Sequence, residues 1–147
     1  MFDKIKKYIK IFVPLGLGLV ISLITKDNMN IYDEIIKPPL APPKIAFPIV
    51  WTILYLFIGY AYYKDSPSKV KKLYYTNLFL NALWSIVFFN LRWFLISIII
   101  ILLLLINTFI LISKFKYSSK ISYYLFIPYF IWLLIATYLN IFIYILN

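Results

Sequence analysis

The sequence predicts an all-α membrane protein, a bundle of five transmembrane helices that forms a single domain over residues 1–147. Hydrophobic residues make up 64% of the chain and charged residues only 14%, whereas a soluble domain is about half apolar and a quarter charged. The apolar residues also fall into runs close to the roughly 20 residues that a helix needs to cross a bilayer. The basic residues lie between these runs. Together these observations exclude a water-soluble domain.

The apolar runs place the five helices at about residues 8–26, 45–63, 73–91, 93–113 and 121–145. The first run follows a basic stretch, as in a signal peptide, but no small-residue cleavage pattern follows it, so we expect a spanning helix. Polar loops are expected at residues 64–72 and 114–120, and a tight turn at Arg92.

The longest loop, residues 27–44, joins the first two predicted helices and ends in the pairs Pro38-Pro39 and Pro42-Pro43. Proline fixes φ and has no N–H to donate, so this segment is expected to be stiff and non-helical. An aromatic helix follows it directly. The loop is therefore predicted to act as a lid over a pocket.

The distribution of basic residues predicts the orientation of the chain in the membrane. Eleven of them lie at the N-terminus and in the loops after the second and fourth helices, against four on the other side. By the positive-inside rule the N-terminus is cytoplasmic, and the first loop and the C-terminus lie outside. The net charge of +10 is thus explained by topology and by contacts with membrane lipids rather than by nucleic acid.

The residue types that are missing limit the chemistry. The sequence has no cysteine and no histidine, so thiol catalysis and the usual metal and haem ligands are excluded, and no metal site is expected. No charged residue lies within an apolar run. This argues against a proton-coupled transporter, a channel with a charged ring and acid–base hydrolysis.

Three predicted helices each place aromatic residues on one helical face, and two of them add asparagine to it. These residues are Trp51 and Tyr55; then Asn77, Asn81, Trp84 and Phe88; then Tyr129, Trp132, Ala136 and Asn140. An asparagine amide is costly in hydrocarbon, so the three faces are expected to point inward. They predict a pocket for a large, flat, mostly apolar ligand held by ring stacking and a few hydrogen bonds.

A purely structural explanation has to be weighed against the pocket. Aromatic belts place Trp and Tyr at both membrane interfaces without any ligand, and asparagines can join helices by hydrogen bonds. For Asn107, the polar residue of an otherwise aliphatic run, we expect such an interhelical bond. The three faces taken together, beside a proline-rich loop, favour the pocket.

Three segments together resemble the translocator protein / tryptophan-rich sensory protein family (TspO/MBR, homologues of the peripheral-type benzodiazepine receptor), in its bacterial form. They are KPPLAPP followed by FPIVWTILYLFIGYA, then NLFLNALWSIVFFNLR, then PYFIWLLIATYLN. The resemblance extends from about Tyr32 to Asn140 and agrees in order and spacing. It implies a five-helix bundle, usually a homodimer, in the bacterial plasma membrane, with a pocket closed by the first loop.

The resemblance also implies ligands. The family binds porphyrins such as protoporphyrin IX and haem, as well as sterols and drug-like isoquinolines or benzodiazepines, and it requires no cofactor. The implied role is sensing, sequestration or transport of such a ligand. One alternative is an enzyme that degrades porphyrin with light and oxygen, for which Trp51 and Trp132 are the candidate catalytic residues. A second alternative is a membrane scaffold that binds no ligand.

Carried over by motif, the resemblance assigns ligand-binding roles to residues of four segments. The motif residues are Trp51 and Tyr55 from VWxxLY, Asn81, Trp84 and Phe89 from LNxxWSxxFF, Trp132 from PYxxW, and Ala136, Thr137 and Asn140 from ATxLN, with Tyr32, Pro42 and Pro43 in the lid. The helical faces add Phe88 and Tyr129 to this set.

The sequence also departs from the family pattern. Ile31 and Leu40 stand where the family has aromatic residues in the lid, so the lid is expected to stack less on a flat ligand. The cholesterol motif of animal members needs a basic residue after its tyrosine, and only Ile145, Leu146 and Asn147 follow Tyr144. A sterol ligand is therefore not expected.

Overall fold

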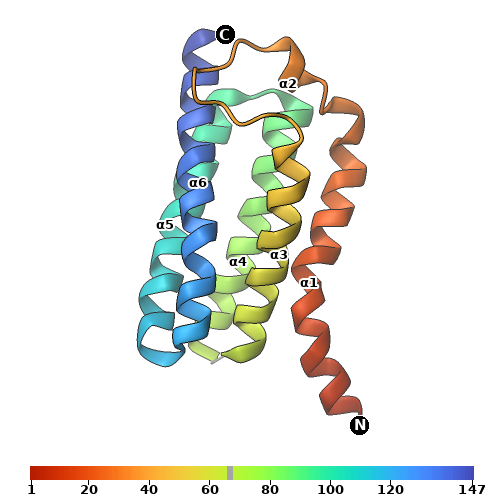
Figure 1. The fold of residues 1–147 in the computed structure, drawn as a ribbon, viewed down its shortest axis with the longest axis vertical. Coiled ribbons are helices and arrows are strands. Elements are labelled where there is room, and N and C mark those ends of the chain that lie inside the picture. Colours follow the sequence, from red (N-terminus) through yellow and green to blue (C-terminus); the bar gives the residue numbers. More distant parts are fainter. Residues whose placement is uncertain (66–67) are drawn as a thin grey trace.

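The computed structural model describes residues 1–65 and 68–147, most of which are helical, and none of them forms a strand. The α-helices are α1 (Phe2–Thr25), α2 (Ile31–Glu34), α3 (Ala46–Lys64), α4 (Ser68–Ser85), α5 (Phe94–Ser118) and α6 (Lys120–Leu146). A 3-10 turn (Lys26–Asn28) follows α1, and a π-helical segment (Ile86–Leu91) continues α4. Helices α3 to α6 stand side by side, α1 leans away toward its N-terminus, and the first loop crosses one end of the bundle (Figure 1).

Four helices in the described part of the chain are long and apolar enough to cross a membrane: α1, α3, α5 and α6. The prediction of five spanning helices is therefore not confirmed. Helix α4 differs because lysines begin it and polar side chains recur along it, among them Asn77, Asn81 and Ser85, all of which are buried. It packs against α5 and α1, so its polar side chains are sheltered by protein.

Several helices extend further than the hydropathy pattern predicted. Helix α1 begins at Phe2, α4 begins at Ser68, and α5 continues to Ser118. Of the loop predicted at residues 64–72, positions 66 and 67 lie outside the described residues, and most of the rest is helical. The loop predicted at 114–120 is reduced to Ser119, whose side chain accepts a hydrogen bond from the Ser122 amide and caps α6. These helices continue beyond the apolar runs into polar residues. Helix ends that leave the hydrocarbon can be polar, so apolarity marks only the part of each helix inside the membrane.

Glycines set the crossing of α1 and α3. A Cβ atom on Gly59 would lie 1.9 Å from the carbonyl oxygen of Ile11, and one on Gly18 would lie 2.4 Å from the Tyr55 ring. A Cβ on Gly16, by contrast, would meet nothing within 4 Å. Small residues let helix backbones approach closely in lipid. Gly18 and Gly59 thus serve helix packing within the monomer.

The turn predicted at Arg92 is confirmed: this residue ends the π-helical segment with φ 55, in the left-handed region. The Pro38–Pro43 segment is non-helical, as its prolines predict. The remainder of the first loop is more ordered than expected, since it contains the 3-10 turn and α2.

Candidate functional site

Four aromatic side chains of α3 and α6 meet inside the bundle: Trp51, Tyr55, Tyr129 and Trp132, which we call the aromatic cluster. The ring of Trp51 stacks on Tyr55 with centroids 5.4 Å apart. It meets Tyr129 edge-on at 6.3 Å and Trp132 edge-on at 6.5 Å. Trp51 is half-buried, whereas its three partners are buried. The structure therefore brings together the predicted faces of α3 and α6.

The first loop reaches the cluster through one further ring, that of Phe47. Phe47 meets Trp132 edge-on at 5.7 Å and Tyr32 of the loop at 5.0 Å. Tyr32 is buried, and its hydroxyl donates to the carbonyl oxygen of Pro42. Sequence reasoning placed Tyr32 and Pro42 in the lid but missed Phe47. Its spacing of one helical turn from Trp51 was the signal that could have identified it. Pro43 is exposed.

The tyrosines of the cluster also begin a buried hydrogen-bond network that crosses the bundle. The Tyr55 hydroxyl donates to Asn81 Oδ1 at 2.8 Å, and Asn81 Nδ2 donates to the Tyr129 hydroxyl at 3.2 Å. Tyr129 in turn donates to Asn77 Oδ1 at 2.8 Å. Both asparagines and Tyr129 have no exposed surface. Their amides are therefore satisfied inside the protein.

The network ends on α5. Asn77 Nδ2 donates to Asn107 Oδ1 at 3.0 Å and to Thr108 Oγ1 at 2.8 Å. The interhelical bond predicted for Asn107 is confirmed. Sequence reasoning missed Thr108, because a threonine in an aliphatic run normally bonds within its own helix. The Thr108 hydroxyl does this too, by donating to the Leu104 carbonyl. We call the linked side chains of Tyr55, Asn81, Tyr129, Asn77, Asn107 and Thr108 the polar chain. It joins α3, α4, α5 and α6.

The remaining predicted residues of α4 and α6 form a second group. Trp84 Nε1 donates to Asn140 Oδ1 at 2.9 Å, and Asn140 Nδ2 donates to the Phe94 carbonyl at 3.2 Å. The Trp84 ring stacks on Phe88 at 5.4 Å and meets Phe89 edge-on at 6.3 Å. The π-helical segment inserts an extra residue per turn, so both adjacent phenylalanines are buried. Phe89 was predicted from its motif and lies off the regular helical face.

Two further predicted residues, Ala136 and Thr137, are buried on α6. The Thr137 hydroxyl donates to the Leu133 carbonyl of its own helix at 2.7 Å. These two residues therefore contribute packing in this conformation.

One polar atom of the aromatic cluster lacks a partner. The indole N–H of Trp132 is buried and forms no hydrogen bond with any described residue. Trp132 as a whole is only 8% exposed. A buried donor without an acceptor costs about 1–3 kcal/mol. Trp132 also lines an apolar groove of about 310 Å³ between α3 and α6, together with Leu54, Phe57 and Pro128.

Two hollows lie beside the predicted faces. A cavity of about 650 Å³ lies at the ends of α5 and α6, lined by residues such as Arg92 and Tyr144. Neither this cavity nor the α3–α6 groove is lined by Tyr55, Asn81 or Trp84. Ring contacts and the polar chain thus fill the space between the predicted faces.

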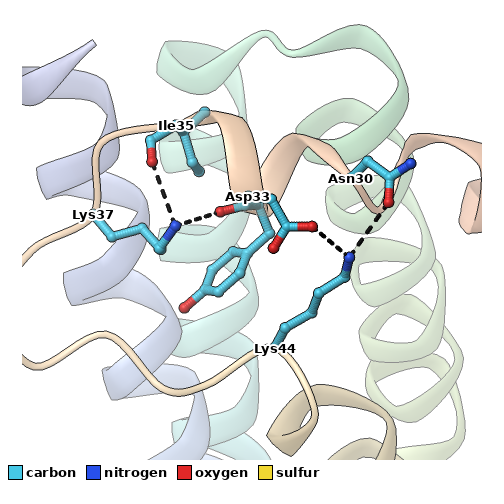
Figure 2. A network of polar contacts seen from close by, with 6 residues as sticks. Asn30, Asp33, Ile35, Lys37 and Lys44 are labelled. Carbon is cyan, nitrogen blue, oxygen red and sulfur yellow. Dashed lines mark hydrogen bonds and ion pairs between the residues drawn. The ribbon is translucent and has the colours of Figure 1, made fainter.

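Polar contacts hold the first loop in place, and Figure 2 shows the part around α2. Lys44 Nζ pairs with Asp33 at 2.7 Å and donates to Asn30 Oδ1 at 3.3 Å. Lys37 Nζ donates to the Tyr32 carbonyl at 2.6 Å and lies 4.9 Å from the centre of the Tyr32 ring. Burial raises the pKa of Tyr32 above that of a free tyrosine. The loop therefore keeps Tyr32 neutral and inside.

Two contacts tie the loop to the helix ends. Arg92 pairs with Glu34 at 3.3 Å. The Asn147 side chain accepts from the Ile36 amide and donates to the Ile36 carbonyl, both at 3.0 Å. Sequence reasoning missed this pair, because nothing local signals a contact across 111 positions.

These features define an integral membrane protein built as a helical bundle. Its first loop contacts the aromatic cluster through Tyr32 and Phe47. The chain belongs to the TspO/MBR family, whose family model matches residues 10–146.

Three relatives agree with this assignment. The chain is 35% identical over 95 residues to a protein named "Tryptophan-rich protein TspO" from Archaeoglobus fulgidus, covering 60% of this chain and 62% of the relative. It is 36% identical over 81 residues to a protein of the same name from Chlorobaculum tepidum, covering 50% and 51%. It is 32% identical over 65 residues to a "Tryptophan-rich sensory protein" from Cereibacter sphaeroides, covering 42% and 41%. Each match thus spans less than two thirds of the relative.

Proposed function

We propose that this protein binds a flat, largely apolar tetrapyrrole such as protoporphyrin IX or haem between α3, α4 and α6, beneath the first loop, as a membrane sensor or translocator. Family membership supports the sensory or translocator role, and one relative is named a sensory protein. The aromatic cluster supports the class of ligand, because its rings offer stacking surfaces to a flat π-system.

The observation that carries the proposal is the unpaired indole N–H of Trp132. If the cluster served packing alone, an apolar side chain would fill the position without leaving a buried donor unpaired. A ligand that brings a carboxylate or carbonyl oxygen would give this N–H an acceptor. It would also replace the contacts that Trp51 and Phe47 now make with the Trp132 ring.

Opening the site requires the loop to move, and the contacts that hold the loop are weak. The Lys44–Asp33 and Arg92–Glu34 pairs have side chains 41–60% exposed, and exposed pairs contribute about 0–1 kcal/mol each. The polar chain shares Tyr55 and Tyr129 with the cluster, and all of its residues are buried, so it resists exchange with water. A ligand therefore enters most readily by displacing Trp51, the least buried member of the cluster.

Binding is tested by titrating purified protein in detergent with protoporphyrin IX and following the Soret band of the porphyrin. We expect saturable binding, weakened about 2- to 10-fold in Trp132→Phe, which keeps the ring contact but removes the N–H donor. Trp93→Phe is the matched control, since Trp93 is exposed and outside the cluster, and should bind as the unaltered protein does. Equal affinity of the Trp132 and Trp93 variants would refute the assigned role of the indole, and absence of saturation would refute the proposal.

A second candidate function, light-driven porphyrin breakdown, is favoured by the spacing of Trp51 and Trp132, whose rings are 6.5 Å apart. In this reaction dioxygen is the oxidant: its two oxygen atoms add to the two carbons of one carbon–carbon bond of the macrocycle, which breaks and leaves two carbonyl groups, so no further oxidant or reductant is consumed. A tryptophan beside the ring would lend an electron to the excited porphyrin and take it back when the oxygenated product forms. Illuminating the complex in air should bleach the Soret band, and Trp51→Phe and Trp132→Phe should slow the loss. Unchanged bleaching in both variants would exclude the named residues.

We further propose that α4 with its π-helical extension crosses the membrane as a fifth helix. It packs against α5 and α1 and runs in the same general direction as the bundle (Figure 1), and its side chains Asn77, Asn81 and Ser85 are buried. The positive-inside rule then places the N-terminus in the cytoplasm and the first loop outside. Labelling a single cysteine placed in the first loop of intact cells would test this. The homodimer stays a prediction of the family resemblance.

A further inference from the structure

The larger cavity has a composition different from that of the aromatic site. It has a volume of about 650 Å³ and is formed by the turn and first residues of α5 (residues 92–96) with Tyr144 and Asn147 at the end of α6. Ligand cavities commonly span about 300–1,000 Å³. No member of the aromatic cluster lines it, so it is a separate place on the molecule.

The cavity contains a cation suited to a phosphate. Arg92 is the single arginine among 15 basic residues of the chain, and its side chain is 49% exposed. It pairs with Glu34 through one nitrogen, Nη1, at 3.3 Å. A guanidinium carries five N–H groups in a planar fork that fits two phosphate oxygens, which an ammonium cannot do. The adjoining end of α5, which begins at Phe94, adds free backbone N–H groups and a positive helix dipole.

Four other residues of the lining are largely apolar and exposed. Trp93, Leu95, Ile96 and Tyr144 are each 45–54% exposed. Tryptophan and tyrosine concentrate at the headgroup level of a membrane, and leucine and isoleucine below it. A cation beside interfacial aromatics and above aliphatic side chains matches an amphiphile with an anionic head, whereas a free phosphate would use only the cation.

We propose that this cavity binds an anionic phospholipid, with Arg92 holding the phosphate in place of the Glu34 carboxylate and the acyl chains lying along Leu95 and Ile96. The exchange is feasible because an exposed ion pair contributes little and the phosphate brings two acceptor oxygens. This inference is independent of the ligand site between α3, α4 and α6.

Binding of the lipid is coupled to the first loop. Glu34 belongs to α2 in that loop, and Asn147, which lines the cavity, holds the loop at Ile36. Lipid and loop therefore compete for Arg92. By linkage, a variant that removes the loop's carboxylate should bind lipid more tightly.

The test uses full-length protein in phosphatidylcholine nanodiscs, into which phosphatidylglycerol with bromine high on its acyl chains is titrated. Bromine quenches tryptophan at contact, and Trp93 lies in the cavity. Subtracting the signal of Trp93→Phe isolates this residue from the other three tryptophans. We expect brominated phosphatidylglycerol to bind about fivefold more tightly than brominated phosphatidylcholine, as expected for one arginine at an anionic headgroup.

Three variants decide the outcome. Arg92→Gln should abolish the preference for phosphatidylglycerol, Arg92→Lys should reduce it, and Glu34→Gln should raise it about two- to fivefold. Lys26→Gln removes an exposed charge of the same sign outside the cavity and should change nothing. The proposal is overturned if Arg92→Gln keeps the preference while its helical circular dichroism is unchanged, or if Glu34→Gln weakens binding. It is also overturned if inorganic phosphate or protoporphyrin IX displaces the brominated lipid, because the site would then serve a soluble anion or the porphyrin.

Discussion

Replacing Asn77 with leucine removes the residue at which the polar chain branches. Asn77 accepts from Tyr129 and donates to Asn107 and Thr108, and it has no exposed surface. Interhelical hydrogen bonds in membrane proteins contribute about 0.6 kcal/mol each, with a maximum near 1.7. Three such bonds give about 2 kcal/mol. Leucine has as many side-chain heavy atoms as asparagine and is no smaller, so none of the loss should come from a cavity.

The assay is reversible unfolding in mixed micelles, followed by circular dichroism, with the free energy of unfolding compared between variants. Thr76→Val is the control, because the Thr76 hydroxyl is exposed and bonds only to Lys72 of its own helix. A double-mutant cycle with Tyr129→Phe isolates the Asn77–Tyr129 bond, for which we expect a coupling of about 0.6–1.7 kcal/mol. If Asn77→Leu is as stable as the unaltered protein, or if the coupling is zero, the polar chain does not hold the four helices together.

Two further predictions concern α1 and the first loop. Gly59→Ala should push α1 away from α3 and lower the free energy of unfolding by about 1–3 kcal/mol, since its Cβ would overlap the Ile11 carbonyl. Gly16→Ala is the control and should leave the stability unchanged, because its Cβ would meet nothing. Equal effects of the two variants in the same unfolding assay would contradict the packing. The raised pKa of Tyr32 means that the unfolded tyrosine loses its proton first, so the stability it contributes is full below about pH 10 and falls as pH rises from there through the higher folded pKa. Proteolysis within the loop should therefore increase above pH 10, and an identical pH profile in Tyr32→Phe would contradict this origin.

Helical periodicity accounts for what sequence reasoning found in the site. Trp51 and Tyr55 share a face at spacing four, as do Asn77 and Asn81, and packing the helices brings these faces to Tyr129. A stripe shows which side of a helix is buried. It does not show which neighbouring helix it meets, so the branch from Asn77 to α5 could not be derived.

Other features depend on departures from regular structure. The π-helical segment moves Phe89 inward, and no residue in its sequence signals the insertion. The two hydrogen bonds between Ile36 and Asn147 join positions that are far apart in the sequence. Apolarity alone identifies four spanning helices, and the fifth stays a prediction. The polar side chains of α4 are bonded inside the bundle, as Asn81 is to Tyr55, and only the structure reveals these bonds.

Tyr55 and Tyr129 belong both to the aromatic cluster and to the polar chain, and this double role limits how the site can open. Their hydroxyls donate hydrogen bonds of 2.8 Å to Asn81 and Asn77, respectively, so these bonds hold their rings in place. Trp51 is half-buried on α3, and Phe47 contacts Tyr32 of the first loop. In the proposed binding mode, a flat ligand would displace Trp51 and Phe47 without breaking a hydrogen bond of the polar chain. The polar chain would then keep the four helices together while the unpaired N–H of Trp132 gained an acceptor from the ligand.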